Sequence, residues 1–131
     1  LHDALPISSF KGLEEALRWA FENPINKNKI DYLVNKIKKE LKKMNVNVID
    51  VSGETTPVIS FTMANYSVNE VGEILQMSFD IICRSGLHCA PLIHKCLRTS
   101  PSGTVRISLS RFTTEEEVDY FINSIKDIID G

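Results

Sequence analysis

The chain has 131 residues, of which 43% are hydrophobic and 24% are charged, and its formal net charge is −2. This length and balance predict one soluble globular domain, with no electrostatic reason to expect nucleic acid or an anionic membrane as a partner. No apolar run approaches the ~20 residues of a membrane span and the N-terminus lacks a signal-peptide pattern, so we expect a cytoplasmic protein.

Two helices are predicted in the first third of the chain. Apolar residues recur at helical spacing over 8–22, and Asn23-Pro24 then ends the pattern. A second and stronger apolar repeat runs over 26–45, and the other faces there carry Lys36, Lys38, Lys39, Lys42 and Lys43. We interpret these lysines as a solvated helix face rather than a basic interaction patch.

The middle of the chain is predicted to form two strands followed by a capped helix. Alternating valines over 46–51 and the β-branched run over 57–63 predict two strands, separated by a turn at 52–56. Ser67 and Glu70 form a capping-box pattern that opens a helix extending to about Met77.

The last part of the chain is predicted to contain two strands and two helices. The apolar segment 79–83 is predicted to be a strand, 84–99 a loop with a short helix, and 104–109 a further strand. Thr113 and Thr114 offer two overlapping capping boxes for a final helix that ends near Gly131. Interleaved strands and amphipathic helices predict an α/β (α+β) fold, a small two-layer sandwich with a short sheet covered by helices.

The segment 83–91 carries the clearest chemical pattern. Gly86 permits a sharp turn, and Pro91 suits the first turn of a helix, which places Cys89 just before a helix N-terminus. Arg84 and His88 lie close enough in sequence to add positive charge. These three effects favour the thiolate, the reactive form of cysteine.

The other cysteines have simpler interpretations. Cys83 and Cys96 lie in apolar segments and are expected to be shielded and structural, with all three thiols free in a reducing compartment. A metal site is the alternative, but the spacing lacks a CxxC pair; its ligands would be Cys83, His88, Cys89, His94 and Cys96. Lys95 follows a histidine but lacks a glycine-rich cofactor context, and we interpret it as a surface residue.

Arg106 is the second candidate site residue. Alternation in the predicted strand puts Thr104, Arg106 and Ser108 on one face. A guanidinium in a strand must meet a carboxylate or face water, and its planar fork suits a bidentate carboxylate. An exposed arginine with no ligand is the alternative.

Together these motifs resemble the class V aminotransferase superfamily in its cysteine desulfurase and selenocysteine lyase branch. The segment Arg84-Ser85-Gly86-Leu87-His88-Cys89-Ala90-Pro91 is similar to that branch's active-site cysteine motif. Residues 103–108 and 112–119 are similar to the downstream arginine strand and the acidic start of the last helix. The resemblance runs from about Ile7 almost to the end of the chain.

The resemblance implies a specific role for each candidate. It implies the C-terminal small domain of a fold-type I pyridoxal-phosphate (PLP) enzyme, with 1–25 as a linking helix from a large domain and 26–131 as the small domain. Cys89 would attack the sulfur of L-cysteine or L-selenocysteine, giving a persulfide and L-alanine. Arg106 would hold the substrate carboxylate, and Arg84 and His88 would line the site.

The resemblance also implies partners and leaves alternatives open. A full-length homodimer and a sulfur-acceptor protein are expected, while the PLP lysine belongs to the large domain, so we expect no PLP on this chain and no turnover by it alone. Leu87, Thr113 and residues 1–6 depart from the family pattern. The alternatives are another class V aminotransferase with an incidental cysteine, and a non-enzymatic thiol or metal-binding module.

Overall fold

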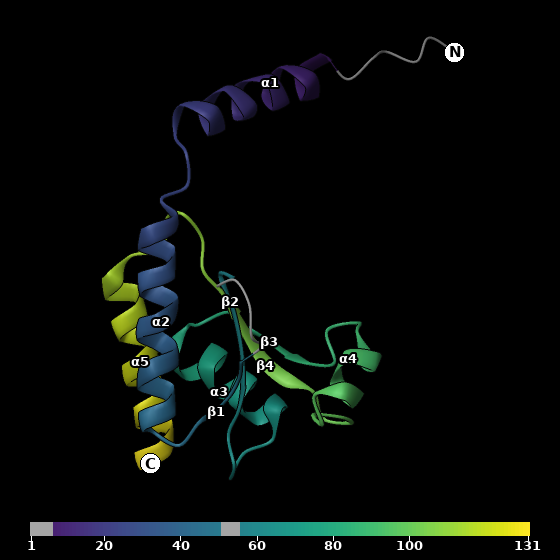
Figure 1. The fold of residues 1–131 in the computed structure, drawn as a ribbon, viewed down its shortest axis with the longest axis vertical. Helices are drawn as coiled ribbons and strands as arrows, with labels where there is room; N and C mark the ends of the chain where they lie inside the picture. Colours follow the sequence, from purple (N-terminus) through teal and green to yellow (C-terminus); the bar gives the residue numbers. More distant parts are fainter. Residues whose placement is uncertain (1–6, 51–55) are drawn as a thin grey trace.

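The structure of the chain is a computed structural model that describes residues 7–50 and 56–131 (Figure 1). Its helices and strands, in chain order, are α1 (Ile7–Glu22), α2 (Lys27–Lys43), β1 (Asn47–Ile49), β2 (Val58–Thr62), α3 (Val68–Phe79), β3 (Arg84–Gly86), α4 (Pro91–Cys96), β4 (Thr104–Ser108) and α5 (Glu115–Asp130). None of the helices in this described part has both the length and the apolar character needed to cross a membrane.

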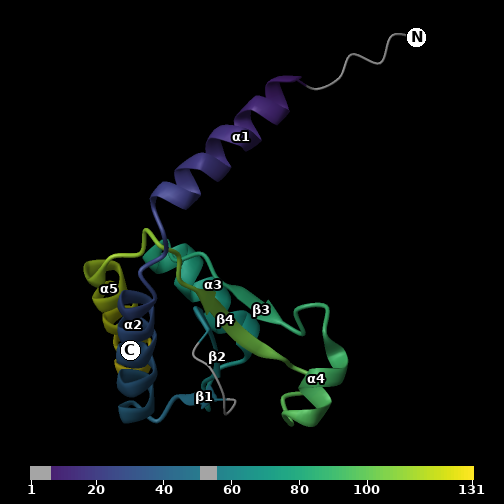
Figure 2. The ribbon, with the colours of Figure 1, turned by 45° about the horizontal axis from the view of Figure 1, so that its top comes forward.

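The four strands form one antiparallel sheet in the order β1-β2-β4-β3. Helices α2, α3 and α5 pack on one face of this sheet, and α4 stands at the end of the sheet distant from α2 and α5 (Figures 1 and 2). The core lies between the sheet and these three helices, where Phe61, Ile59, Val105, Leu33, Leu75 and Ile125 are almost fully buried. The predicted two-layer α+β fold is therefore confirmed.

Strand alternation explains why only one face of the sheet joins the core. Ile59, Phe61 and Val105 point toward the helices, while Ser60 and Arg106 alternate with them and face away. Burying such apolar side chains stabilises the fold at roughly 25 cal/mol per Å² of apolar surface. The opposite face carries Ser60, Thr62 and Arg106 as well as the apolar Val58.

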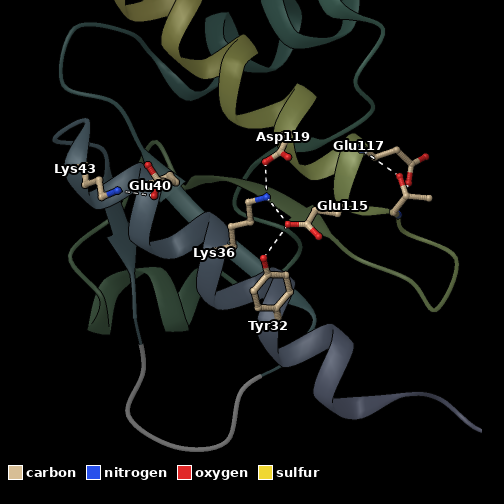
Figure 3. Close-up of polar contacts among 8 residues, drawn as sticks. Tyr32, Lys36, Glu40, Lys43, Glu115, Glu117 and Asp119 are labelled. Carbon is tan, nitrogen blue, oxygen red and sulfur yellow. Dashed lines mark hydrogen bonds and ion pairs between the residues drawn. The ribbon is translucent and has the colours of Figure 1, made fainter.

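An ion cluster ties α2 to α5 (Figure 3). The Lys36 ammonium donates to the carboxylates of Glu115 at 2.7 Å and Asp119 at 2.6 Å, and the Tyr32 hydroxyl donates to Glu115 at 2.8 Å. Hydrogen bonds from Lys36 and Tyr32 hold the pKa of Glu115 below its ordinary value. Lys38, Lys42 and Lys43 of α2 also pair with carboxylates within the chain, which favours a solvated face over a basic binding patch.

The caps of the helices follow the sequence patterns closely. Ser67 and Glu70 form the predicted capping box of α3, and Thr114 forms another with Glu117 at the start of α5. Thr113 does not cap: its hydroxyl accepts the Ser110 N–H at 2.9 Å. Val51 and residues 52–55 of the predicted turn lie outside the described residues.

The strand predicted at 79–83 is wrong. Phe79 is the last residue of α3, and Asp80 takes a left-handed conformation (φ 54°) that ends the helix. Ile81 and Cys83 still pack on the core, which explains the apolar pattern without a strand. The strand begins instead at Arg84, because backbone pairing with β4 is available only from that point.

Helix α1 extends away from the rest of the chain (Figures 1 and 2). Its apolar side chains are exposed, including Phe10, Leu13 and Leu17 at half or more of their surface. Two contacts hold its end: the Trp19 ring stacks on Phe112 with centroids 5.9 Å apart, and its centroid lies 5.0 Å from the Arg111 guanidinium. The division into a linking helix over 1–25 and a domain over 26–131 stays a prediction.

Candidate functional site: the Cys89 turn and the arginine pair

Cys89 lies in a tight turn between β3 and α4. The Ala90 N–H donates to the Leu87 carbonyl at 2.8 Å, and both central residues have positive φ, 52° for His88 and 60° for Cys89. This pattern is the signature of a type I′ turn. Pro91 follows as the first residue of α4, so Cys89 lies just ahead of a helix, as predicted, with its side chain exposed.

The turn carries backbone strain at two consecutive residues. A residue with a Cβ pays roughly 1–2 kcal/mol to enter the left-handed region, and neither His88 nor Cys89 is a glycine. Such conformations persist only where the surroundings hold them, and they are concentrated at functional sites. The geometry therefore marks this turn as a candidate site independently of the sequence motif.

His88 is the residue that attaches the turn to the sheet. Its Nε2 lies 3.1 Å from the hydroxyl of Thr104 in β4, and its ring lies 5.7 Å from that of His94. Its Nδ1 is buried without a hydrogen-bond partner among the described residues. Burial, followed by the charges of Arg106 and His94, lowers the pKa of His88 below 6.5. The imidazole is thus neutral at neutral pH, so His88 does not supply the positive charge that the sequence led us to expect.

We predict that His88 titrates below its ordinary value of 6.5 and makes the fold less stable in acid. The unfolded chain takes up this proton first as pH falls, so the free energy of unfolding decreases below about pH 6.5 and levels off once the folded pKa is passed. NMR titration of the His88 ring measures the pKa. The variant His88→Gln should lose this part of the pH dependence, and a His88 pKa above 6.5 would contradict the assignment.

Arg84 and Arg106 lie side by side on the open face of the sheet. They are directly paired across β3 and β4, with Ser60 on the other side of Arg106. Ser85 faces α3, since a Cβ on Gly72 would lie 3.2 Å from its hydroxyl, and alternation sends Arg84 to the opposite face. Neither guanidinium has a carboxylate partner within the described residues. Two adjacent cations of this kind favour an anionic ligand.

The three thiols differ in their surroundings. Cys83 is half-buried against the core, and burial raises its pKa. Cys89 is exposed. Cys96 is exposed as well, so the prediction that it is shielded is wrong. The reason is that α4 turns Leu92, Ile93 and Cys96 outward, against the interpretation of the segment as an amphipathic helix packed on the core.

We therefore predict that Cys89 and Cys96 are alkylated at least about tenfold faster than Cys83 near neutral pH. Exposure admits the reagent at the first two positions, while burial disfavours the Cys83 thiolate. Timed alkylation with mass mapping gives the three rates in one experiment. Modification of Cys83 before Cys89 would contradict the placement of the turn.

The comparisons with known proteins agree with this geometry. The sequence model of the family described as aminotransferase class-V matches residues 3–121. The chain belongs to this family. Its relatives include a probable cysteine desulfurase of Mycobacterium leprae (strain TN), 35% identical over 86 residues, which cover 66% of this chain and 14% of that protein. Another, from Synechocystis sp., is 31% identical over 74 residues, which cover 56% of this chain and 17% of that protein.

Solved structures extend the likeness to the fold. The apo cysteine desulfurase of Thermococcus onnurineus NA1 matches with a TM-score of 0.73 at 27% identity, covering 79% of this chain and 26% of that one. The Escherichia coli cysteine desulfurase CsdA, in its S-sulfonic acid form, matches with a TM-score of 0.81 at 20% identity, covering 97% and 31%. This class-V chain therefore corresponds to about a third or less of each of these proteins.

Membership of this family implies PLP in the full-length enzyme, and that this chain itself binds none stays a prediction. Lys95 is exposed on α4, and Lys36, Lys38, Lys42 and Lys43 are engaged with carboxylates. The described residues also contain no group of three or more side chains placed to hold a metal ion. The candidate site of this class-V chain consists of the exposed Cys89 thiol, the neutral His88 imidazole and the guanidinium groups of Arg84 and Arg106.

Sequence reasoning considered His94 only as a ligand of the alternative metal site, and it missed the contacts that Thr99 and Thr104 make with the two histidines. His94 is buried, its Nδ1 lies 2.7 Å from the Thr99 hydroxyl, and Thr104 is buried where it meets His88. No spacing in the sequence indicates that His94 is buried, because Leu92 and Ile93 are the apolar residues of α4 and would be expected to face the core. Leu87, which departs from the family pattern, serves the turn through its backbone carbonyl.

Proposed function

We propose that this chain is the C-terminal small domain, residues 26–131, of a PLP-dependent cysteine desulfurase, with residues 1–25 linking it to a large domain. The observation that carries the proposal is the Cys89 turn: an exposed thiol in a strained turn, attached through His88 to the strand that carries Arg106. The cysteine desulfurase names of its relatives support the same reading.

The proposed reaction moves one sulfur atom from L-cysteine to Cys89. The Cys89 thiolate attacks the substrate sulfur, so an S–S bond forms as the substrate's C–S bond breaks, and the carbon takes up a proton to give L-alanine. The cofactor, held by the large domain, supplies the electron sink for this cleavage. Exposure of Cys89 lets the sulfur pass on to an acceptor protein.

Arg106 is proposed to bind the substrate carboxylate, with Arg84 and His88 lining the site beside it. Arg106 is half-buried and unpaired by any described carboxylate, which suits a ligand that brings its own negative charge. His88, being neutral, is proposed to hold the turn rather than to carry charge. L-Selenocysteine would fit the same site, because Arg106 is proposed to bind the substrate carboxylate and does not distinguish selenium from sulfur.

The wider setting is also proposed from the family resemblance. The full-length protein is inferred to be a homodimer of the cytoplasm, where a reducing environment keeps the three cysteines free, as they are in this structure.

The test is turnover of L-cysteine by the full-length protein with PLP, followed by mass mapping of the protein under non-reducing conditions. The expected result is one L-alanine per sulfur released and one added sulfur atom on the peptide that carries Cys89. Added sulfur on the peptide of Cys96, the neighbouring exposed thiol, would contradict the assignment. Transamination of an amino acid without sulfur release would instead favour a class-V aminotransferase with an incidental cysteine.

We predict that Arg106→Ala in the full-length protein lowers kcat/KM for L-cysteine at least about 30-fold, mainly through KM. Removing a charged bidentate contact costs roughly 2–5 kcal/mol. Steady-state kinetics on L-cysteine measure the change, with Arg111→Ala as a control because that guanidinium contacts Trp19 and Asn23 instead. A lower melting temperature with unchanged kinetics would show that Arg106 serves only the fold.

A further inference from the structure

Helix α4 is anchored by a histidine instead of by its apolar residues. His94 is 4% exposed, while Leu92 is 74% and Ile93 is 50% exposed. Burying an imidazole is costly unless its nitrogens find partners, and two apolar side chains lie beside it in the same helix. Packing alone therefore does not explain why a histidine occupies the buried position 94 of α4.

The contacts of His94 fix its ring in place. Its Nδ1 lies 2.7 Å from the Thr99 hydroxyl, and its carbonyl accepts the N–H groups of Thr99 at 2.9 Å and Ser100 at 3.2 Å. The chain that leaves α4 thus closes over His94 through three short contacts. This arrangement orients the ring as well as burying it.

The ring of His94 lies against the residue that precedes the candidate nucleophile. The centroids of the His88 and His94 rings are 5.7 Å apart with a tilt of 46°, and the Nε2 of His88 contacts the buried Thr104 of β4. The side chains of Thr104, His88, His94 and Thr99 thereby form a continuous chain from the sheet to the end of α4. His88 is clamped between β4 and α4, and Cys89 follows it directly.

We propose that His94 is a positioning residue for Cys89, acting through the His88 ring to hold the turn in its left-handed conformation. Without this support His88 and Cys89 are free to relax to negative φ, which side chains with a Cβ favour. The role of Cys89 as nucleophile rests on the function proposed above, whereas the clamp itself is a property of the fold.

The test compares backbone exchange at the turn in variants of the full-length protein. The variant His94→Leu replaces the imidazole with an apolar side chain of similar size. In it the peptide carrying the Ala90 N–H should exchange about tenfold faster or more, while peptides of β4 keep their protection. Ile93→Ala, in the same helix but exposed, should leave both unchanged. Equal loss of protection in β4 and the turn, or no change at the turn, would overturn the proposal.

A second pair of variants covers the case in which His94→Leu does not fold. Thr99→Val removes the hydroxyl that orients His94 and should speed exchange at the turn, whereas Thr99→Ser retains the hydroxyl and should behave as the wild type. In turnover of L-cysteine, His94→Leu and Thr99→Val should lower kcat with little change in KM, since Arg106 is untouched. If Thr99→Val and Thr99→Ser behave alike, the clamp is refuted. A wild type without desulfurase activity refutes the proposed function and leaves the exchange result to decide the clamp.

Discussion

Cys89→Ser in the full-length protein is expected to lower the release of sulfur from L-cysteine by about a thousandfold or more. Serine keeps the size of the side chain and should fit the turn, but a hydroxyl cannot accept the sulfur atom at neutral pH as a thiolate does. Losses of this order are what removal of a nucleophile causes in other enzymes. The measurement is L-alanine production under saturating substrate, with sulfide or persulfide followed in parallel.

Cys96→Ser is the matched control for this variant. Both thiols are exposed and seven residues apart, yet only Cys89 lies in the strained turn. We expect Cys96→Ser to retain the wild-type rate. A Cys89→Ser protein that produces L-alanine from L-cysteine at the wild-type rate would exclude Cys89 as the sulfur carrier and would favour the aminotransferase alternative.

Gly103→Ala is expected to destabilise the domain by about 3 kcal/mol or more, which is a large part of the stability of a domain of this size. Gly103 has φ +81°, and a Cβ there would lie 2.0 Å from the Gly86 carbonyl oxygen. The clash is with backbone atoms of Gly86, so no change of side-chain rotamer can relieve it. β3 would therefore have to move away from β4. Denaturant unfolding followed by circular dichroism measures the effect.

Gly86→Ala separates the two causes of this loss. Gly86 also has positive φ, +102°, but a Cβ there meets nothing within 4 Å. Gly86→Ala should therefore destabilise the domain by roughly 1–3 kcal/mol, the conformational cost alone, because there is no clash. Equal destabilisation in the two variants would show that the close approach of the strands contributes nothing.

The two glycines connect the fold to the site. Gly103 begins the approach to β4, and Gly86 ends β3 immediately before the turn of Cys89. Their close backbone contact brings Thr104 within reach of His88, on which the turn depends. A separation of β3 from β4 should therefore alter the turn and the arginine pair as well as the stability.

Local patterns were sufficient wherever a residue and its near neighbours decide the structure. The capping box of Ser67 and Glu70, the end of α1 before Asn23-Pro24 and the strand that begins at Thr104 all follow from patterns within a few residues, and each prediction is confirmed. The position of Cys89 ahead of α4 followed from Pro91 for the same reason. The segment 79–83 shows the limit, because burial of Ile81 and Cys83 gives the apolar pattern of a strand without the pairing.

The α+β class, the capping boxes at Ser67 and Thr114, the motif around Cys89 and the strand that carries Arg106 were all predictable from the sequence, because periodicity and local hydrogen bonding depend on adjacent residues. The pairing of Arg84 with Arg106, the burial of His94 in place of Ile93 and the exposure of Cys96 became known only from the folded chain. These features depend on how β3 registers against β4 and how α4 docks at the end of the sheet. Such long-range contacts are set by the packing of the whole domain, so no spacing along the chain reveals them.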